Sequence, residues 1–168
     1  DQERAYSLAG SSLLDAGLGR VEEARRDALR GLAIAERLGD ATSQPHFRGV
    51  LGFIALSLGD ARAARDWLAP ASEELLRLGV GEVSIYPVVH NEIDAAVACG
   101  ELERAEHLTA HLEALAARTG RTWTRAMAAR GRAQLLAAGV DTGAAREALA
   151  LDLGDDENRF HPDWLTAV

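Results

Sequence analysis

Two series of small residues recur along this 168-residue chain with a period of about 40 residues. One series consists of alanines that follow a glycine-containing turn, at Ala24, Ala64, Ala105 and Ala145. The other consists of glycines that follow an apolar stretch, at Gly39, Gly79 and Gly120. Glycine is favoured just past a helix end because it adopts the left-handed conformation without strain. Two series with one period therefore predict repeated helix hairpins.

The apolar residues between these markers have helical spacing, as in Leu51, Ile54 and Ala55. Alanine and leucine dominate the apolar residues, and aromatic residues make up 5% of the chain, which favours helices over sheets. We expect Asp60 to cap one helix and Asp141 or Thr142 to cap the last. We expect Pro70 to kink or split its helix. The predicted helices span about residues 2–17, 21–38, 43–58, 61–78, 84–98, 102–118, 122–138 and 142–152.

The second repeat resembles a lengthened tetratricopeptide repeat. Leu51 and Gly52 stand where that motif places its Leu-Gly pair, Gly59 and Asp60 stand at its turn, and Ala64 stands where its second helix packs. The resemblance implies an all-α fold, a right-handed stack of about four antiparallel helix hairpins in a tetratricopeptide-like α-solenoid. The expected division is four repeats and a C-terminal tail or cap, at residues 1–40, 41–80, 81–121, 122–154 and 155–168.

The wording of residues 87–149 resembles the helical repeat region of the large ATP-binding LuxR-type transcriptional regulators of actinobacteria, which are MalT-related. A Gly-Glu-Leu turn precedes a leucine-rich helix at residues 100–105, and an Ala-Arg-x-Gly-Arg-x-Trp segment occupies residues 117–123. These motifs are structural. The resemblance implies an ATP-binding part upstream and a DNA-binding helix-turn-helix downstream, and neither occurs in this sequence. Residues 150–168 depart from the family pattern.

Charge and composition exclude several classes of function for this segment. The net charge is −8 and every basic residue is arginine, so we expect no direct contact with nucleic acid. No apolar run reaches the ~20 residues of a membrane span, and the first residues lack a secretion signal. Cys99 is the only cysteine, and we expect it to be a small buried apolar residue in a cytoplasmic protein. Because the chain begins at Asp1, we expect an excised segment of a larger bacterial protein.

The sequence carries no recognisable catalytic motif. It has neither a phosphate-binding loop nor a Gly-x-Ser-x-Gly turn, and we expect no enzyme activity, cofactor or metal. His107 and His111 lie four residues apart and could hold a metal with Glu103, but a solvated face in which Glu103 pairs with His107 is the favoured interpretation. Trp67 and Trp123 could form a ligand cage, although we expect anchors between neighbouring hairpins.

The first helices of successive hairpins in such a stack line a concave surface, where we expect a protein, peptide or small inducer to bind. Projecting the repeat from each turn glycine places eight residues there: Tyr6, Leu13, His46, Phe53, His90, Asp94, Met127 and Arg130. Leu13 and Phe53 could equally be core between repeats, and Met127 is also a candidate core residue. Burial of His46, His90 or Asp94 without a partner would be costly, so we expect them to face the groove.

Two hypotheses follow from these patterns. The first is a non-catalytic sensor or scaffold segment of an ATP-dependent LuxR-type regulator, which passes a signal to flanking domains of the parent chain. The second is a free-standing peptide-binding adaptor. An enzyme is a third class, but no nucleophile, base and orienting group occur together in the sequence.

Overall fold

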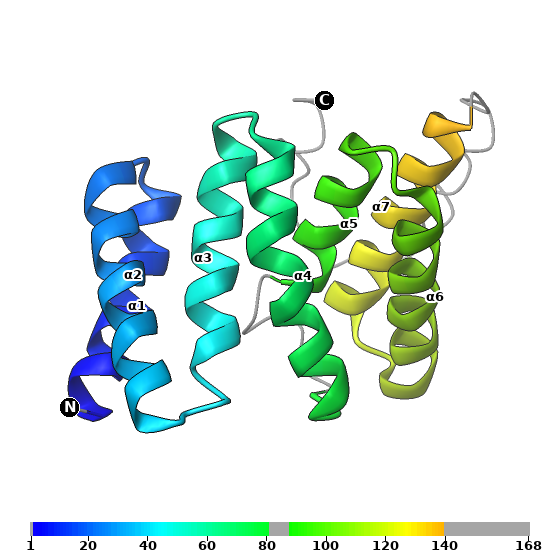
Figure 1. The fold of residues 1–168 in the computed structure, drawn as a ribbon. Helices are drawn as coiled ribbons and strands as arrows, with labels where there is room; N and C mark the ends of the chain where they lie inside the picture. The colour runs from blue at the N-terminus through cyan, green and yellow to red at the C-terminus, as the bar shows by residue number, and fades with distance from the viewer. Residues whose placement is uncertain (1, 81–87, 140–168) are drawn as a thin grey trace.

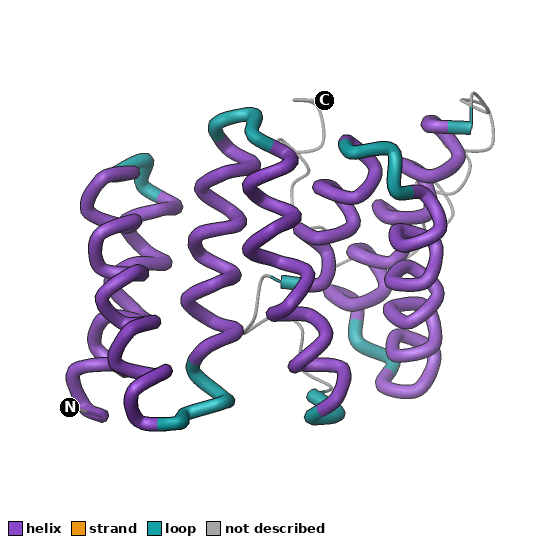
Figure 2. Tube along the Cα trace, viewed as in Figure 1, coloured by secondary structure: helices purple, strands orange, loops and turns teal. Residues whose placement is uncertain are grey.

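The computed structural model describes residues 2–80 and 88–139, and all regular structure in these two ranges is helical. The described residues form seven helices, and Figures 1 and 2 show how they pack in chain order as antiparallel neighbours. They are α1 (Gln2–Gly17), α2 (Val21–Leu38), α3 (Gln44–Ser57), α4 (Ala61–Arg77), α5 (Val89–Ala98), α6 (Leu102–Thr119) and α7 (Thr122–Ala138). The predicted all-α fold is confirmed. The predicted eighth helix, and the start of the fifth at residues 84–87, lie outside the described residues, and the repeat boundaries stay a prediction.

Helix ends in the structure lie where the glycine series and the capping residue predict them. Gly39 and Gly120 each follow a helix with a φ of 66°, in the left-handed region that glycine tolerates. At the start of α4, the Asp60 carboxylate accepts a hydrogen bond of 2.9 Å from the backbone N–H of Ala63, so the expected cap is present. The expected caps Asp141 and Thr142 lie outside the described residues.

Pro70 lies inside α4 and does not split it, so of the two predicted effects the split is wrong and the kink stays a prediction. Proline removes one backbone hydrogen bond, but its ring is exposed here. On the opposite side, Leu68, Ala71 and Leu75 are buried in the core. Burial of that face compensates for the backbone hydrogen bond that Pro70 cannot donate, so the helix continues past it.

The helices form two layers. Along the stack, the backbone of α1 approaches that of α3, α3 approaches α5, and α5 approaches α7. Within the described residues the backbones of α2, α4 and α6 do not approach one another in this way, although the Arg104 side chain of α6 reaches Ser72 of α4. The helices of only one layer therefore approach closely along the stack. We therefore call α1, α3, α5 and α7 the inner layer and α2, α4 and α6 the outer layer.

Close approach between helices depends on glycines in the middle of helices. A Cβ atom at Gly31 would collide with the ring of Phe47, and one at Gly52 would collide with Leu68. Phe47 and Leu68 are both fully buried. Glycine inside a helix lowers its stability, but at these two positions the absence of a Cβ atom lets a bulky side chain from a neighbouring helix fill the space.

The prediction that Cys99 is buried is wrong, because its side chain is exposed. Cys99 is the capping residue that follows the last residue of α5, directly before the turn residue Gly100. Helical spacing predicts burial only within a helix, and the turn carries Cys99 away from the core.

Candidate functional site

The structure brings three of the predicted site residues together between α5 and α7. His90 and Asp94 lie one turn apart on α5, and Arg130 of α7 donates a hydrogen bond of 2.6 Å to the Asp94 carboxylate. The ring of Trp123, also on α7, meets His90 edge to face with 6.3 Å between ring centroids. Gln134 of α7 donates a hydrogen bond to Asp94 as well. We call these five residues the α5–α7 cluster.

The ion pair in the cluster is largely shielded from water. The Asp94 and Arg130 side chains are 17% and 30% exposed. Burial raises the pKa of the Asp94 carboxyl, while the Arg130 charge and the hydrogen bonds from Gln134 and Arg130 oppose that rise. The guanidinium therefore compensates a carboxylate that would be costly to bury alone.

His90 is the unusual member of the cluster. Burial, assisted by the positive charge of Arg130, lowers the pKa of His90 to about 4. The imidazole is therefore neutral at neutral pH. Its Nδ1 atom is buried without a hydrogen-bond partner, and so is the Oε1 atom of Gln134. Unpaired buried polar atoms are uncommon, so the cluster retains hydrogen-bonding capacity that nothing in the described residues uses.

The other predicted site residues do not join this cluster. Met127 is 3% exposed and belongs to the core, so its placement on the binding surface is corrected. Leu13 and Phe53 are half-buried and pack against the N-terminal core, which buried residues of α1, α2 and α3 form. This is what the alternative interpretation of these two residues expects. The Nε2 atom of His46 lies 2.9 Å from the backbone oxygen of Ala9, which links α3 to α1. The side chain of Tyr6 lies outside the described residues.

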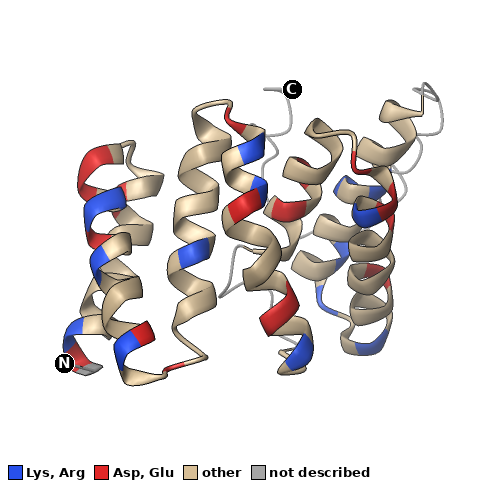
Figure 3. Ribbon diagram, viewed as in Figure 1, with Lys and Arg blue, Asp and Glu red and all other residues tan. Residues whose placement is uncertain are grey.

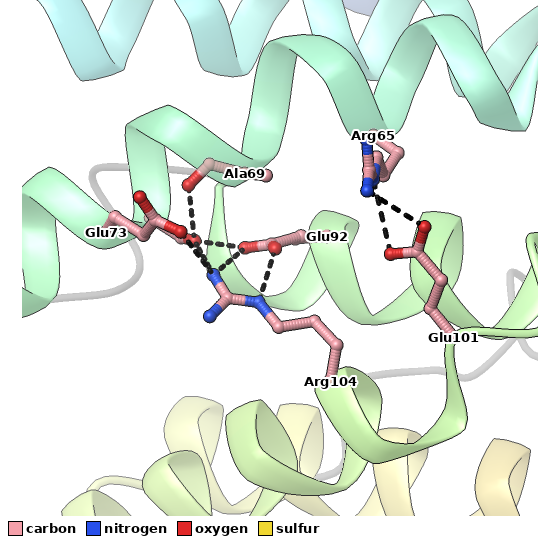
Figure 4. Close-up of polar contacts among 7 residues, drawn as sticks. Arg65, Ala69, Glu73, Glu92, Glu101 and Arg104 are labelled. Atoms are coloured by element: carbon pink, nitrogen blue, oxygen red, sulfur yellow. Dashed lines mark hydrogen bonds and ion pairs between the residues drawn. The ribbon is translucent and has the colours of Figure 1, made fainter.

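A second polar network, which the sequence analysis missed, joins α4, α5 and α6 (Figure 4). Glu92 is 1% exposed, and the Nε atom of Arg104 donates a hydrogen bond of 2.8 Å to it. The hydroxyl of Ser72 also contacts Glu92 and accepts a hydrogen bond of 3.0 Å from Arg104. The partners lie on three helices, so no local sequence pattern reveals them. Because the carboxylate and the guanidinium are satisfied, the network has a structural role.

A metal site is not formed by His107, His111 and Glu103. Across residues 2–80 and 88–139, no group of three or more His, Cys, Asp or Glu residues could hold a metal ion. Burial is the main cause that lowers the pKa of His111. His107 is exposed to solvent, as the interpretation of a solvated face expects.

The two tryptophans of the described helices differ. Trp67 is partly buried against the N-terminal core, in agreement with its expected role as an anchor. Trp123 is 44% exposed, although its contact with His90 does connect α7 to α5. An aromatic surface of this exposure is available to a partner.

Figure 3 shows how the charges are distributed over the stack. The charged residues within α7 are all arginines, and acidic residues of α5 and α6 pair with two of them. Arg130 pairs with Asp94, and Arg132 donates hydrogen bonds to Glu106 and Glu113 of α6. These two arginines are engaged within the protein. No described helix is long and apolar enough to cross a membrane.

Comparison with known proteins identifies no relative: no family model, no curated protein and no solved structure matches the chain. The assignment to a functional class therefore depends on the α5–α7 cluster and on the sequence motifs.

Proposed function

We propose that this chain is a non-catalytic sensor or scaffold segment that receives a partner on its inner layer at the α5–α7 cluster. The observation that carries the proposal is the exposed ring of Trp123 against His90, whose Nδ1 atom is buried without a hydrogen-bond partner in the described residues. Ligand sites combine apolar surface with a few convergent polar groups. The cluster has this composition and contains no hydroxyl, thiol or amine nucleophile, which favours binding over catalysis.

The motifs at residues 100–105 and 117–123 extend the proposal to a biological context. Their resemblance to the repeat region of ATP-dependent LuxR-type regulators supports a role in the cytoplasm, where the stack would pass an inducer or protein signal to flanking domains. The net charge of −8 and the pairing of Arg130 and Arg132 support a role without direct contact to nucleic acid. A free-standing peptide-binding adaptor is the alternative, because it would use the same surface.

The gene that encodes these residues tests the regulator context. An open reading frame with a phosphate-binding loop upstream and a helix-turn-helix downstream would support the regulator. A short frame with neither would overturn it in favour of the adaptor. The binding surface is tested separately with Trp123→Ala in the full chain. In the Trp123→Ala variant, the signal that the inducer or partner protein elicits should fall, while the helical content stays unchanged. A signal as strong as in the unchanged protein would contradict the proposed surface.

A further inference from the structure

The first helix of the stack, α1, has an apolar face that no other described helix covers. Leu14 and Leu18 lie one turn apart on this helix and the turn that follows it. They are 68% and 66% exposed, more than any other large apolar side chain in the described part of the chain. Exposed apolar side chains on adjacent turns form a patch of the kind that marks a contact surface.

Gly10 leaves a gap on the same face, one turn before Leu14. An added Cβ atom would meet nothing within 4 Å at Gly10, whereas at Gly31 it would collide with the ring of Phe47. Glycine in a helix interior lowers stability, and at Gly31 the space it leaves is used by a neighbouring helix. The space above Gly10 is therefore suited to a side chain from a partner.

The exposed positions of α1 form a continuous seam. Ser7, Gly10, Leu14 and Gly17 are all exposed and follow one another at intervals of three, four and three residues. Two helices that pack along each other use this spacing. Ser12, halfway along the seam in sequence, is fully buried, so it lies on the opposite side of the helix. The seam therefore faces away from the core.

The seam is complementary to itself when two copies of it run antiparallel. Gly10 and Leu14 lie two residues to either side of Ser12, and Ser7 and Gly17 lie five residues to either side. A twofold axis perpendicular to α1 at the level of residue 12 sets Leu14 of each copy opposite Gly10 of the other. Each protruding side chain then enters a gap, and a twofold pairing of this kind is closed.

Charge and helix direction also favour a second copy as the occupant. The charged residues of α1 and the turn after it are Glu3, Arg4, Asp15 and Arg20, and Arg20 lies 3.1 Å from Asp15. This face therefore has no net charge, although the whole chain carries −8. Antiparallel α1 helices also continue the order of the stack, in which consecutive helices are antiparallel neighbours (Figure 1).

We propose that α1 is a homodimer interface, in which two copies of this chain pack their α1 helices antiparallel, with Leu14 of each copy on Gly10 of the other. The interface and the α5–α7 cluster lie at opposite ends of the described stack. The inference therefore does not depend on the proposed binding role of the cluster, and either can fail without the other.

The experiment is sedimentation velocity of the 168-residue chain from about 1 to about 500 μM, a range that includes the affinities of weak, specific dimers. The unchanged protein should show a reversible equilibrium between monomer and dimer. Leu14→Glu should raise the dissociation constant at least about tenfold, because a carboxylate would be buried without a counter-charge. A monomer at every concentration would overturn the inference.

Leu29→Glu is the matched control, because Leu29 is 44% exposed on the outer layer, and it should leave the dissociation constant unchanged. Circular dichroism and urea denaturation at a concentration where the protein is monomeric should show that Leu14→Glu still folds normally. An equal loss of dimer in both variants would also contradict an interface at α1.

Gly10→Leu separates the self-complementary pairing from general apolar association. Leucine at this position would occupy the gap that Leu14 of the other copy needs, so the dimer should weaken at least about tenfold. The helical content of the monomer should not fall, because leucine forms helices better than glycine and meets nothing at this position. A Gly10→Leu variant that associates as tightly as the unchanged protein, or more tightly, would overturn the proposed pairing.

Discussion

Leu14 and Ile54 occupy the same position in two successive repeats, five residues before the turn glycines Gly19 and Gly59, yet Leu14 is 68% exposed and Ile54 is 2% exposed. Ile54 packs in the N-terminal core together with residues of α2. No described helix covers the corresponding face of α1. The same local sequence position is therefore core in one hairpin and surface in another, and the stack alone decides which.

Truncation of these two side chains to alanine should change the free energy of unfolding by different amounts. Ile54→Ala should lower the free energy of unfolding by about 2–5 kcal/mol, because it leaves a cavity in the core. Leu14→Ala should change it by less than about 0.5 kcal/mol, because no packing is lost. Urea denaturation of both variants measures the difference. Equal losses would mean that α1 packs in a way the structure does not show.

Enlarging Ala105 should destabilise the protein. Ala105 is fully buried where α6 begins its packing, so Ala105→Leu should cost about 1–3 kcal/mol through overpacking. Ala110→Leu is the matched control, because it adds the same volume at an exposed position of the same helix. Thermal denaturation of the two variants is the measurement. An unchanged melting temperature for Ala105→Leu would show that the alanine series does not mark close packing.

The buried pair formed by Glu92 and Arg104 should show strong energetic coupling. Arg104→Leu leaves the buried Glu92 carboxylate without its partner and should cost about 3–5 kcal/mol. Glu92→Leu should cost less, because Arg104 is 28% exposed and still lies 4.0 Å from Glu73. The double variant should cost much less than the sum of the two, because neither charge then remains. A double-mutant cycle by chemical denaturation measures the coupling. Additive losses would show that the 2.8 Å contact contributes little.

The sequence predicted the helices well because glycine conformation and helical spacing are local properties. Gly39 and Gly120 mark helix ends through their own backbone preference, whatever surrounds them. The neighbours of a side chain, in contrast, depend on helices that are distant in the sequence. The repeat pattern places Met127 on the concave surface, but the packing of α7 on α5 and α6 buries it. Glu92 meets Arg104 and Ser72 only after three helices have assembled, so one sequence could not reveal that network.

His90 should make stability depend on pH below neutrality. Its folded pKa of about 4 lies below the ordinary value of 6.5, so the unfolded state binds more protons in that window. Stability should fall as pH drops from 6.5 to 4, by about 3 kcal/mol for this group alone. Asp94 acts in the opposite direction, because its raised pKa favours proton binding by the folded state. Denaturation of the protein and of His90→Gln at several pH values isolates the His90 contribution, and identical pH profiles would refute it.

Site-specific photo-crosslinking in cells that make the protein tests the binding surface most directly. A photoreactive phenylalanine derivative replaces Trp123 in one variant and Leu29 in the other; both residues are 44% exposed, the first on the inner layer and the second on the outer layer. We predict a discrete adduct, detected by mass spectrometry, at position 123 and none at position 29. An adduct at position 29 with none at position 123 would contradict the account.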